Sequence, residues 1–272
     1  MTKTKQMLYT IILLGVCSVF AFPFIWLLLS CFKNNSEIFR PLQILPSAYS
    51  FQYFSELWNN PHISFFKHFF NSCFISIAQT IGVILIAVPA GYIFAKHSFK
   101  YSTPLFIFCL LSILLPSQIL LIPLFEWMTW LKLIDTPASV ILPNIANGLA
   151  LIFFTVAFKK TPNELLDAAR SEGANEYRVF LTILPMNKSF ILTYALLHFI
   201  LSWHQHLIPM IMLQSEENMT VAVSLSMMLS RSLQFNYATV MVGSLFILLP
   251  TLTLFILLYK NFKSSLADLF SD

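Results

Sequence analysis

Charged residues occur in this chain as short clusters separated by long uncharged runs. Six of these runs contain between 23 and 28 residues without an Asp, Glu, Lys or Arg. A membrane core about 30 Å thick is crossed by about 20 apolar residues in an α-helix. Each run is therefore long enough for one span, and the pattern predicts spans near residues 7–32, 69–95, 104–124, 138–158, 189–213 and 238–259.

Within these runs the apolar residues are continuous and do not alternate with polar ones. In lipid each backbone polar group needs a partner inside its own segment, which favours helices, whereas a β-barrel would show alternating segments of about ten residues. The run that begins at Met7 exceeds the apolar core of a cleaved signal peptide, so we interpret it as a retained first helix. The expected fold is an all-α membrane protein in which residues 1–272 form a single transmembrane domain of six helices.

The composition agrees with this interpretation. Hydrophobic residues make up 57% of the chain and charged residues 10%, against about 25% charged residues in soluble domains. With the N-terminus placed in the cytoplasm, 11 of the 16 Lys and Arg residues fall in cytoplasmic segments, as the positive-inside rule requires. Both termini are therefore expected in the cytoplasm, and topology explains the net charge of +4 better than nucleic-acid binding does.

The four cysteines lie within or beside the predicted spans and form no Cys-x-x-Cys pair; they are Cys17, Cys31, Cys73 and Cys109. Apolar burial explains them better than a disulfide framework or a zinc site, so we expect no metal and no cofactor. The glycines do not form the G-x-x-x-x-G-K-[ST] loop that binds nucleotide phosphates. The chain is therefore not expected to be an enzyme, and any ATP that drives it would be hydrolysed by a separate subunit.

The segment between the fourth and fifth predicted spans has strong helix signals of its own. Thr161 is a suitable N-cap, Pro162 suits the first helical position, and Glu164 would complete a capping box. Gly173 can adopt the left-handed conformation that ends a helix. A second short helix is expected over residues 175–185, so this loop is predicted to be a folded helix-turn-helix.

Apolar side chains form a strip along the first of these two helices, namely Leu165, Leu166, Ala168 and Ala169. A short helix outside the bilayer needs a cover over such a strip. The groove of a partner protein would provide one, and so would the membrane surface or the rest of the same chain. The local sequence leaves both explanations open.

The same loop resembles the signature of one transporter family. Asp167-Ala168-Ala169 and Gly173, followed by Ile183-Leu184-Pro185, are similar to the pattern E-A-A-x-x-x-G and then I-x-L-P of ABC-importer permeases. The form Asp-Ala-Ala-x-x-Glu-Gly-Ala is most similar to the sugar-importer branch, which includes maltose-type and glycerol-3-phosphate permeases. Asp167 stands where the family usually has Glu, and it keeps the charge on a shorter side chain.

The resemblance implies a subunit of a binding-protein-dependent importer in the bacterial inner membrane, transporting a sugar, an oligosaccharide or a glycerol-3-phosphate-like solute. The implied partners are a second permease subunit, two ATP-binding subunits, an extracytoplasmic solute-binding protein and membrane lipid. Loop 160–186 would supply the cytoplasmic coupling helix between spans four and five. The residues that would dock on the ATPase are Glu164, Asp167, Ala168, Ala169, Glu172, Gly173 and Ala174.

Polar side chains inside the spans are candidates for the solute path, because they are costly in lipid and tend to face the interior of a helix bundle. The candidates are Gln79, Gln118, Asn144, Asn147, His198, Trp203, His204, Gln205 and His206. A hydrogen bond between helices is the alternative role for each of them. His204 and His206 are two positions apart on a predicted helix and would face different directions, so the pair is not expected to bind a metal.

Two other function classes agree less well with the sequence than the importer does. A secondary transporter acting without an ATPase would usually place charged residues inside its spans, and the predicted spans contain none. An intramembrane enzyme would need a nucleophile with a base. Ser202 lies near His198 and His206 in the sequence, but no oxyanion or ligand set accompanies them.

Overall fold

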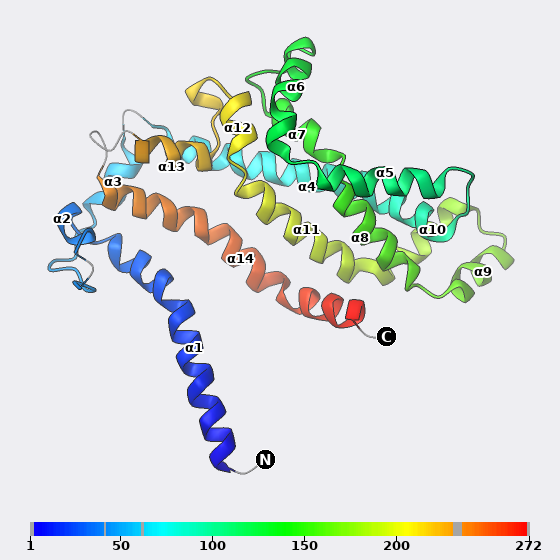
Figure 1. Ribbon diagram of the computed structural model, residues 1–272, viewed down its shortest axis with the longest axis horizontal. Coiled ribbons are helices and arrows are strands. Elements are labelled where there is room, and N and C mark those ends of the chain that lie inside the picture. The colour runs from blue at the N-terminus through cyan, green and yellow to red at the C-terminus, as the bar shows by residue number, and fades with distance from the viewer. Residues whose placement is uncertain (1–2, 41, 61–62, 231–235, 271–272) are drawn as a thin grey trace. The chain divides into compact units, whose positions relative to one another are not determined.

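The computed structural model describes residues 3–40, 42–60, 63–230 and 236–270. Every regular element within these ranges is a helix (Figure 1). The chain divides into two compact units, the first made of Met1–Phe66 with Ser224–Leu249 and the second of Lys67–Val223 with Pro250–Asp272. The second unit contains the helix-turn-helix loop and all the polar residues proposed for the solute path.

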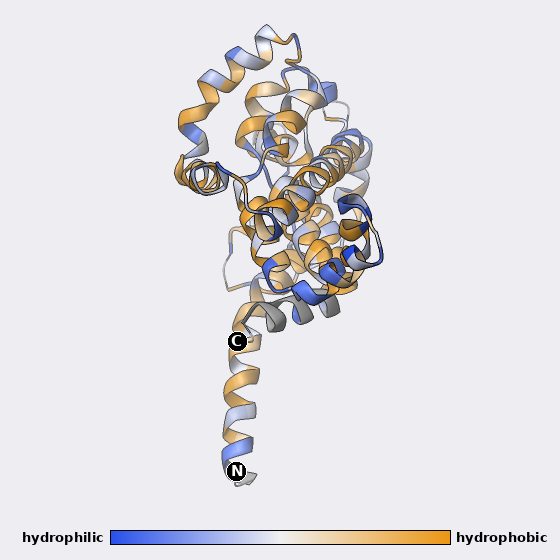
Figure 2. Ribbon diagram, turned by 90° about the vertical axis from the view of Figure 1, so that its right-hand side faces the viewer, coloured by the Kyte–Doolittle hydropathy of each residue, from blue (hydrophilic) through white to orange (hydrophobic). Residues whose placement is uncertain are grey.

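The first unit begins with the long helix α1 (Lys3–Ser30), followed by the short helices α2 (Asn35–Ile38) and α3 (Gln52–Trp58). It also contains most of α13 (Val221–Ser230) and the first part of α14 (Tyr237–Phe270). The side chains of residues 5–25 in α1 are all exposed, and after the first turns they are mostly apolar (Figure 2). Such a surface suits lipid or another apolar protein surface and not water.

The second unit contains nearly all of α4 (Phe65–Lys96) and the last part of α14. Between them the chain forms α5 (Ser102–Leu114), α6 (Ser117–Trp130), α7 (Pro137–Ile145), α8 (Gly148–Lys159), α9 (Asn163–Ser171), α10 (Glu176–Ile183), η1 (Pro185–Asn187), α11 (Lys188–Trp203), α12 (Leu207–Met212) and η2 (Glu216–Asn218).

Four helical stretches are long and apolar enough to cross a membrane, namely Lys5–Ser30, Phe65–Lys96, Glu176–Trp203 and Tyr237–Tyr259. Two further pairs qualify only when each pair is taken together. The first pair, α5 and α6, bends by 105°, and the second pair, α7 and α8, bends by 43°. The described chain therefore has four to six candidate spans, and it has the six that the sequence predicts if each bent pair is one span.

The third and fifth predicted spans are not single straight helices. α5 ends two residues before Pro116, and residues 204–206 separate α11 from α12, which contains Pro209. A proline ring clashes with the carbonyl group four residues earlier and removes one backbone hydrogen bond, which favours a kink or a break. The helix breaks before Pro116 and Pro209, whereas α4 and α14 continue through Pro89 and Pro250. The fifth apolar stretch also begins earlier than predicted, because α10 leads through η1 directly into α11.

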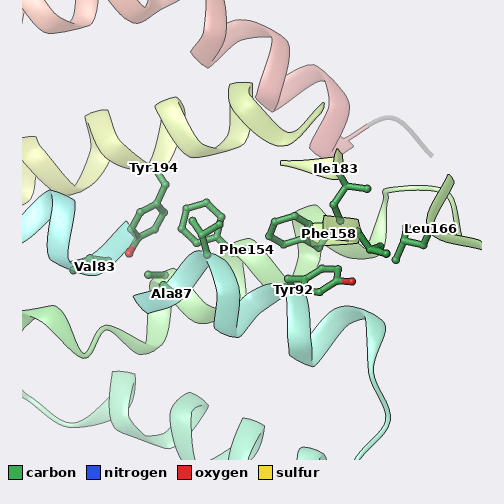
Figure 3. Close-up of a cluster of buried hydrophobic side chains, with 11 residues drawn as sticks. Val83, Ala87, Tyr92, Phe154, Phe158, Leu166, Ile183 and Tyr194 are labelled. Atoms are coloured by element: carbon green, nitrogen blue, oxygen red, sulfur yellow. The ribbon is translucent and has the colours of Figure 1, made fainter. Parts of the chain in front are cut away.

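One buried apolar cluster joins α4, α8, α9, α10 and α11 (Figure 3). Its members are Val83, Ala87, Val88, Tyr92, Ala150, Phe154, Phe158, Leu166, Val179, Ile183 and Tyr194. We call it the central cluster. α4 and α8 approach so closely beside it that a Cβ added to Gly91 would lie 2.6 Å from Cβ of Phe154. Glycine at this position allows the close packing that connects the long helices to the loop.

Candidate functional site

The loop between α8 and α11 folds as two helices, α9 and α10, at one end of the second unit (Figure 1). The predicted capping box is wrong, because α9 begins at Asn163 after Pro162 and no side chain caps it. Thr161 is engaged elsewhere. Its hydroxyl accepts a 3.1 Å hydrogen bond from Asn187 Nδ2, and its carbonyl accepts one from Lys96 Nζ at the end of α4.

The turn after α9 is a Schellman motif centred on Gly173. The Gly173 N–H donates to the Arg170 carbonyl at 2.9 Å, and the Ala174 N–H donates to the Ala169 carbonyl at 3.1 Å. These are the two backbone bonds that define the motif. Gly173 has φ +82°, and no atom lies within 4 Å of the position that a Cβ would take. Glycine is therefore required here by backbone conformation and not by crowding, as the sequence indicates.

α10 is capped at its start and buried along one side. Asn175 Oδ1 accepts a 2.9 Å hydrogen bond from the Arg178 N–H, which satisfies an otherwise free donor of the first turn. Val179 and Ile183 are fully buried in the central cluster. The second helix expected over residues 175–185 is thus present as α10, and it packs on the membrane helices.

α9 has one buried and one exposed face. Leu166 is 1% exposed and lies in the central cluster with Tyr92 and Phe158 (Figure 3). Its neighbour Leu165 is 40% exposed, and Ala168 is exposed as well. The apolar strip on this helix is therefore divided. The chain itself covers one half, and the other half is exposed.

The residues that the resemblance assigns to docking fall on both faces of the loop. Glu164, Asp167, Ala168, Glu172 and Gly173 are exposed, whereas Ala169 and Ala174 are half-buried against the central cluster. Asp167 already has a partner within α9, because Arg170 Nη1 lies 3.2 Å from its Oδ1. Leu165 is an exposed member of the apolar strip, and the resemblance does not assign it to docking.

Polar groups from the last turns of α4 contact the loop. Lys96 Nζ donates to Asn163 Oδ1 at 2.7 Å, and the Tyr92 hydroxyl donates to Glu176 Oε2 at 3.1 Å. Glu176 also accepts from Arg170 Nε at 2.9 Å, and this carboxylate is the main reason that the pKa of the Arg170 guanidinium is raised. Sequence reasoning missed these contacts because Tyr92 and Glu176 are 84 positions apart.

A second group of polar side chains lies where α4, α7 and the end of α11 meet. Gln79, which is 1% exposed, donates from Nε2 to the Val140 carbonyl at 2.9 Å and accepts at Oε1 from Ser202 Oγ at 2.6 Å. Gln205 lies 3.5 Å from the Gln79 amide and 3.4 Å from Asn144 Oδ1. We call Gln79, Asn144, Ser202 and Gln205 the amide cluster. The sequence offers Ser202 only as a possible nucleophile, whereas in the structure its hydroxyl donates a hydrogen bond to Gln79.

Asn147 and His198 connect helices near this cluster. Asn147 Oδ1 accepts from the Ala150 N–H at 3.0 Å and from the Tyr194 hydroxyl at 3.1 Å, so it caps α8 and ties that helix to α11. This cap also explains why a new helix starts at the bend between α7 and α8. His198 Nδ1 lies 3.3 Å from Thr80 Oγ1 of α4. Asn147 and His198 therefore each form a hydrogen bond between two helices.

The remaining candidates occupy other settings. Trp203 is 1% exposed, and its ring lies 5.3 Å from that of Phe69 and 5.7 Å from that of Phe199. This packing places it among aromatic side chains. Gln118 is exposed on α6.

His204 directly follows α11, and its Nε2 lies 3.4 Å from Thr251 Oγ1. The chain from His204 to His206 is not helical, so the expectation that both histidines lie on one helix is wrong. Pro209 accounts for the break, as described above.

Comparisons with known proteins also match transport-system permeases. The profile of the family described as "Binding-protein-dependent transport system inner membrane component" matches residues 87–267. The arabinooligosaccharides transport system permease protein AraQ of Bacillus subtilis is 33% identical over 94% of this chain and 92% of that protein. The lactose transport system permease protein LacG of Rhizobium radiobacter is 31% identical over 96% of each chain. The sn-glycerol-3-phosphate transport system permease protein UgpE of Yersinia enterocolitica is 26% identical over 96% of this chain and 95% of that protein.

A solved structure has the same fold. A chain from the crystal structure of a bacterial ABC transporter involved in the import of the acidic polysaccharide alginate matches with a TM-score of 0.79, over 96% of this chain and 98% of that chain, at 18% identity. The present chain belongs to the family of inner-membrane components of binding-protein-dependent transport systems. It is a permease subunit of an ABC importer, which confirms the resemblance in its sequence.

Proposed function

We propose that this subunit couples ATP hydrolysis on a separate subunit to the uptake of a neutral saccharide, and that α9 is the helix on which the ATPase docks. The observation that carries the proposal is the divided surface of α9. Leu165 and Ala168 are open, while Leu166, one position from Leu165, fixes the helix to the central cluster. A partner can therefore hold one face of α9 and move the membrane helices through the other.

The open face of α9 has a small apolar centre with acidic residues around it. Leu165 and Ala168 are three positions apart and so lie side by side on the helix, while Glu164, Asp167 and Glu172 are exposed on the same helix or at its end. Full burial of a leucine side chain contributes about 1.5–3 kcal/mol. The matching partner surface is a groove with an apolar floor and basic residues at its rim.

Movement of α9 would pass into the spans by direct packing. Leu166 of α9 and Ile183 of α10 share the central cluster with Tyr92 of α4 and Phe158 of α8 (Figure 3). α4 also carries Gln79 of the amide cluster. A displacement of the loop would thus change the packing of the helices that hold this cluster, as alternating access requires.

The chemistry of the amide cluster favours a neutral solute rich in hydroxyl groups. Gln79, Asn144, Ser202 and Gln205 offer both donors and acceptors and carry no charge. An anionic solute would be bound more strongly by Arg or Lys, which the six predicted spans lack. Of the relatives above, those named for arabinooligosaccharides and lactose agree with this choice better than the one named for glycerol-3-phosphate.

Family membership supports the remaining partners. We infer a second permease subunit, two ATP-binding subunits and an extracytoplasmic solute-binding protein, in the bacterial inner membrane. The positive-inside rule supports a cytoplasmic location for α9, α10 and both termini. The exposed apolar residues 5–25 of α1 would face lipid or the second permease.

The docking claim can be tested by purifying the tagged full-length chain from its native membrane. We expect an ATP-hydrolysing protein with a nucleotide-binding P-loop to co-purify with the unaltered chain. Leu165→Asp and Ala168→Asp should each release it, because a carboxylate would be buried in an apolar groove. The measurements are the mass spectrum and the ATPase activity of the eluate.

Leu181→Asp is the matched control, since Leu181 on α10 is 42% exposed, close to the exposure of Leu165. It should retain the ATPase. Persistence of both uptake and ATPase co-purification in Leu165→Asp and Ala168→Asp would contradict docking through α9. Uptake by the purified chain alone, driven by an ion gradient, would contradict the dependence on an ATPase.

A further inference from the structure

A carboxylate at the start of α10 joins three helices of the second unit. Glu176 accepts hydrogen bonds from the Tyr92 hydroxyl of α4 at 3.1 Å and from Arg170 Nε of α9 at 2.9 Å. His97 Nε2, directly after α4, lies 3.3 Å from Glu176 Oε2. Arg170 reaches Asp167 as well, at 3.2 Å. We call Tyr92, His97, Arg170 and Glu176 the Glu176 hub.

The hub lies beside the turn that connects α9 to α10. Residues 172–175 form this turn, and the backbone hydrogen bonds donated by Gly173 and Ala174 both lead back to α9. The other end of α9 is held by Lys96, which donates to Asn163 Oδ1 at 2.7 Å. Polar contacts at both ends of α9 therefore lead to the last turns of α4.

The exposure of the hub argues for a positional role and against a large role in stability. The side chains of Arg170 and Glu176 are 36% and 53% exposed, and ion pairs as exposed as this usually add little to folding stability. The geometry is nevertheless restrictive. Two guanidinium nitrogens of Arg170 reach the two carboxylate oxygens, at 2.9 and 3.4 Å, while Tyr92 holds one of those oxygens from α4.

We propose that Glu176 is a positioning residue that fixes α9 to the end of α4, so that an ATPase subunit pulling on α9 moves α4 and does not merely bend the Gly173 turn. The inference rests on the proposed function, because it requires α9 to be the docking helix. α4 also carries Gln79, so a rigid connection delivers the movement to the amide cluster. Tyr92 and Arg170 act through Glu176.

The test uses the complete transporter, purified with its ATPase subunits through a tag on this chain and reconstituted in lipid. Spin labels at Ser171→Cys on α9 and Lys100→Cys beyond α4, in a background without the native cysteines, report the distance between the two helices by double electron–electron resonance. With Glu176 intact, we expect a narrow distance distribution that ATP does not change. In Glu176→Gln and in Tyr92→Phe, we expect the narrow distribution to be lost and its mean to shift when ATP binds.

Two control variants make the same chemical changes on α10 outside the hub. Tyr177→Phe removes a hydroxyl from a side chain that is 68% exposed, and Arg178→Gln removes a guanidinium from an exposed one. Both should keep the narrow distribution. Combining Arg170→Gln with Glu176→Gln should broaden the distribution no more than either change alone, because both break the same contact.

The outcomes separate the two proposals. Distributions that stay narrow in Glu176→Gln and Tyr92→Phe, with the ATPase subunits retained, would overturn the positioning role and leave the proposed function intact. A lower yield of complex with a narrow distribution in what survives would overturn it too, since that is the result of a purely structural role. Absence of ATPase subunits from the unaltered preparation would overturn the proposed function itself.

Discussion

The helix-turn-helix loop and the amide cluster lie in the same unit of the molecule but are built in opposite ways. The loop owes its shape to residues close in sequence, such as the Gly173 turn and the cap at Asn175. The amide cluster joins Gln79 to Gln205 across 126 positions, and its polar groups bond to one another and to the Val140 carbonyl. The turn and the helix ends of the loop can thus be specified locally, whereas a buried polar site needs the whole bundle.

If this comparison is correct, changes in the loop should affect the partner, and changes in the cluster should affect the solute. Adjacent leucines of α9 provide the sharpest test and the largest expected effect. Leu166→Ala would leave a cavity in the central cluster and cost about 2–5 kcal/mol of folding free energy. Leu165→Ala, at a position 40% exposed, should leave folding nearly unchanged and weaken ATPase co-purification.

Thermal unfolding of the detergent-solubilised chain measures the first effect, and ATPase activity in the eluate measures the second. Equal loss of stability in Leu165→Ala and Leu166→Ala would show that α9 does not have one buried and one open face.

The next largest effect is expected in the amide cluster. Gln79→Leu removes the acceptor of Ser202 Oγ, and an unsatisfied buried polar group costs about 1–3 kcal/mol. The Val140 carbonyl keeps its second donor, Asn144 Nδ2, at 2.8 Å. Uptake into proteoliposomes should fall about tenfold, as expected if the solute loses one hydrogen bond of about 1.4 kcal/mol, while the ATPase still co-purifies. Gln6→Leu makes the same change at an exposed position of α1 and serves as the control. Loss of the ATPase in Gln79→Leu would show that the two regions are not separable.

A smaller effect is expected at the turn. Gly173→Ala forces a residue with a Cβ into φ +82° and should cost about 1–2 kcal/mol, whereas Gly173→Asn should cost less because Asn tolerates this conformation. Limited proteolysis between α9 and α10 measures how often the turn opens. Gly15→Ala in α1 is the control: no atom lies within 4 Å of its Cβ position, and a helix interior favours Ala over Gly, so this change should not increase cleavage of the turn. If Gly173→Ala increased cleavage no more than Gly15→Ala does, the turn would not need its left-handed residue.

The smallest effect concerns a hydrogen-bonded carboxylate that belongs to neither region. Asp135 Oδ1 accepts from the backbone N–H of Ser215 at 2.9 Å and from that of Gln214 at 2.9 Å, and the Ser215 bond is the main reason that its pKa is lowered. The carboxylate is therefore stabilised in the folded state. Its contribution is complete above the usual pKa of an aspartate and is lost as the pH falls through the lower folded-state pKa.

Between pH 5 and pH 8 the contribution of this contact to the thermal midpoint should therefore stay constant. Asp135→Asn should lower the midpoint by about 2–4 °C, the shift expected for loss of about 1 kcal/mol. A midpoint difference between wild type and Asp135→Asn that vanished at pH 7 would contradict the assignment. Asp135→Asn should leave ATPase co-purification and uptake unaffected, because neither the loop nor the amide cluster contains Asp135.

The features read correctly from the sequence are those with a local signal. The apolar runs predict the long helices, Gly173 predicts the end of α9, and Asn175 marks the start of α10. The errors have physical causes that lie outside a local window. Thr161 does not cap α9 because it is engaged with Asn187 and Lys96, and the helix expected through His204 breaks because of Pro209.

The sequence by itself determined that the chain crosses a membrane as helices, that one loop is folded, and that it belongs to an importer family. Each of these depends on composition, periodicity or a short motif. The tertiary structure decided which leucine of α9 is buried, which polar residues form the amide cluster, and that Glu176 joins α9 to α4. These depend on side chains from distant parts of the chain packing against one another, and hydrogen bonds over such separations have no counterpart in a local sequence pattern.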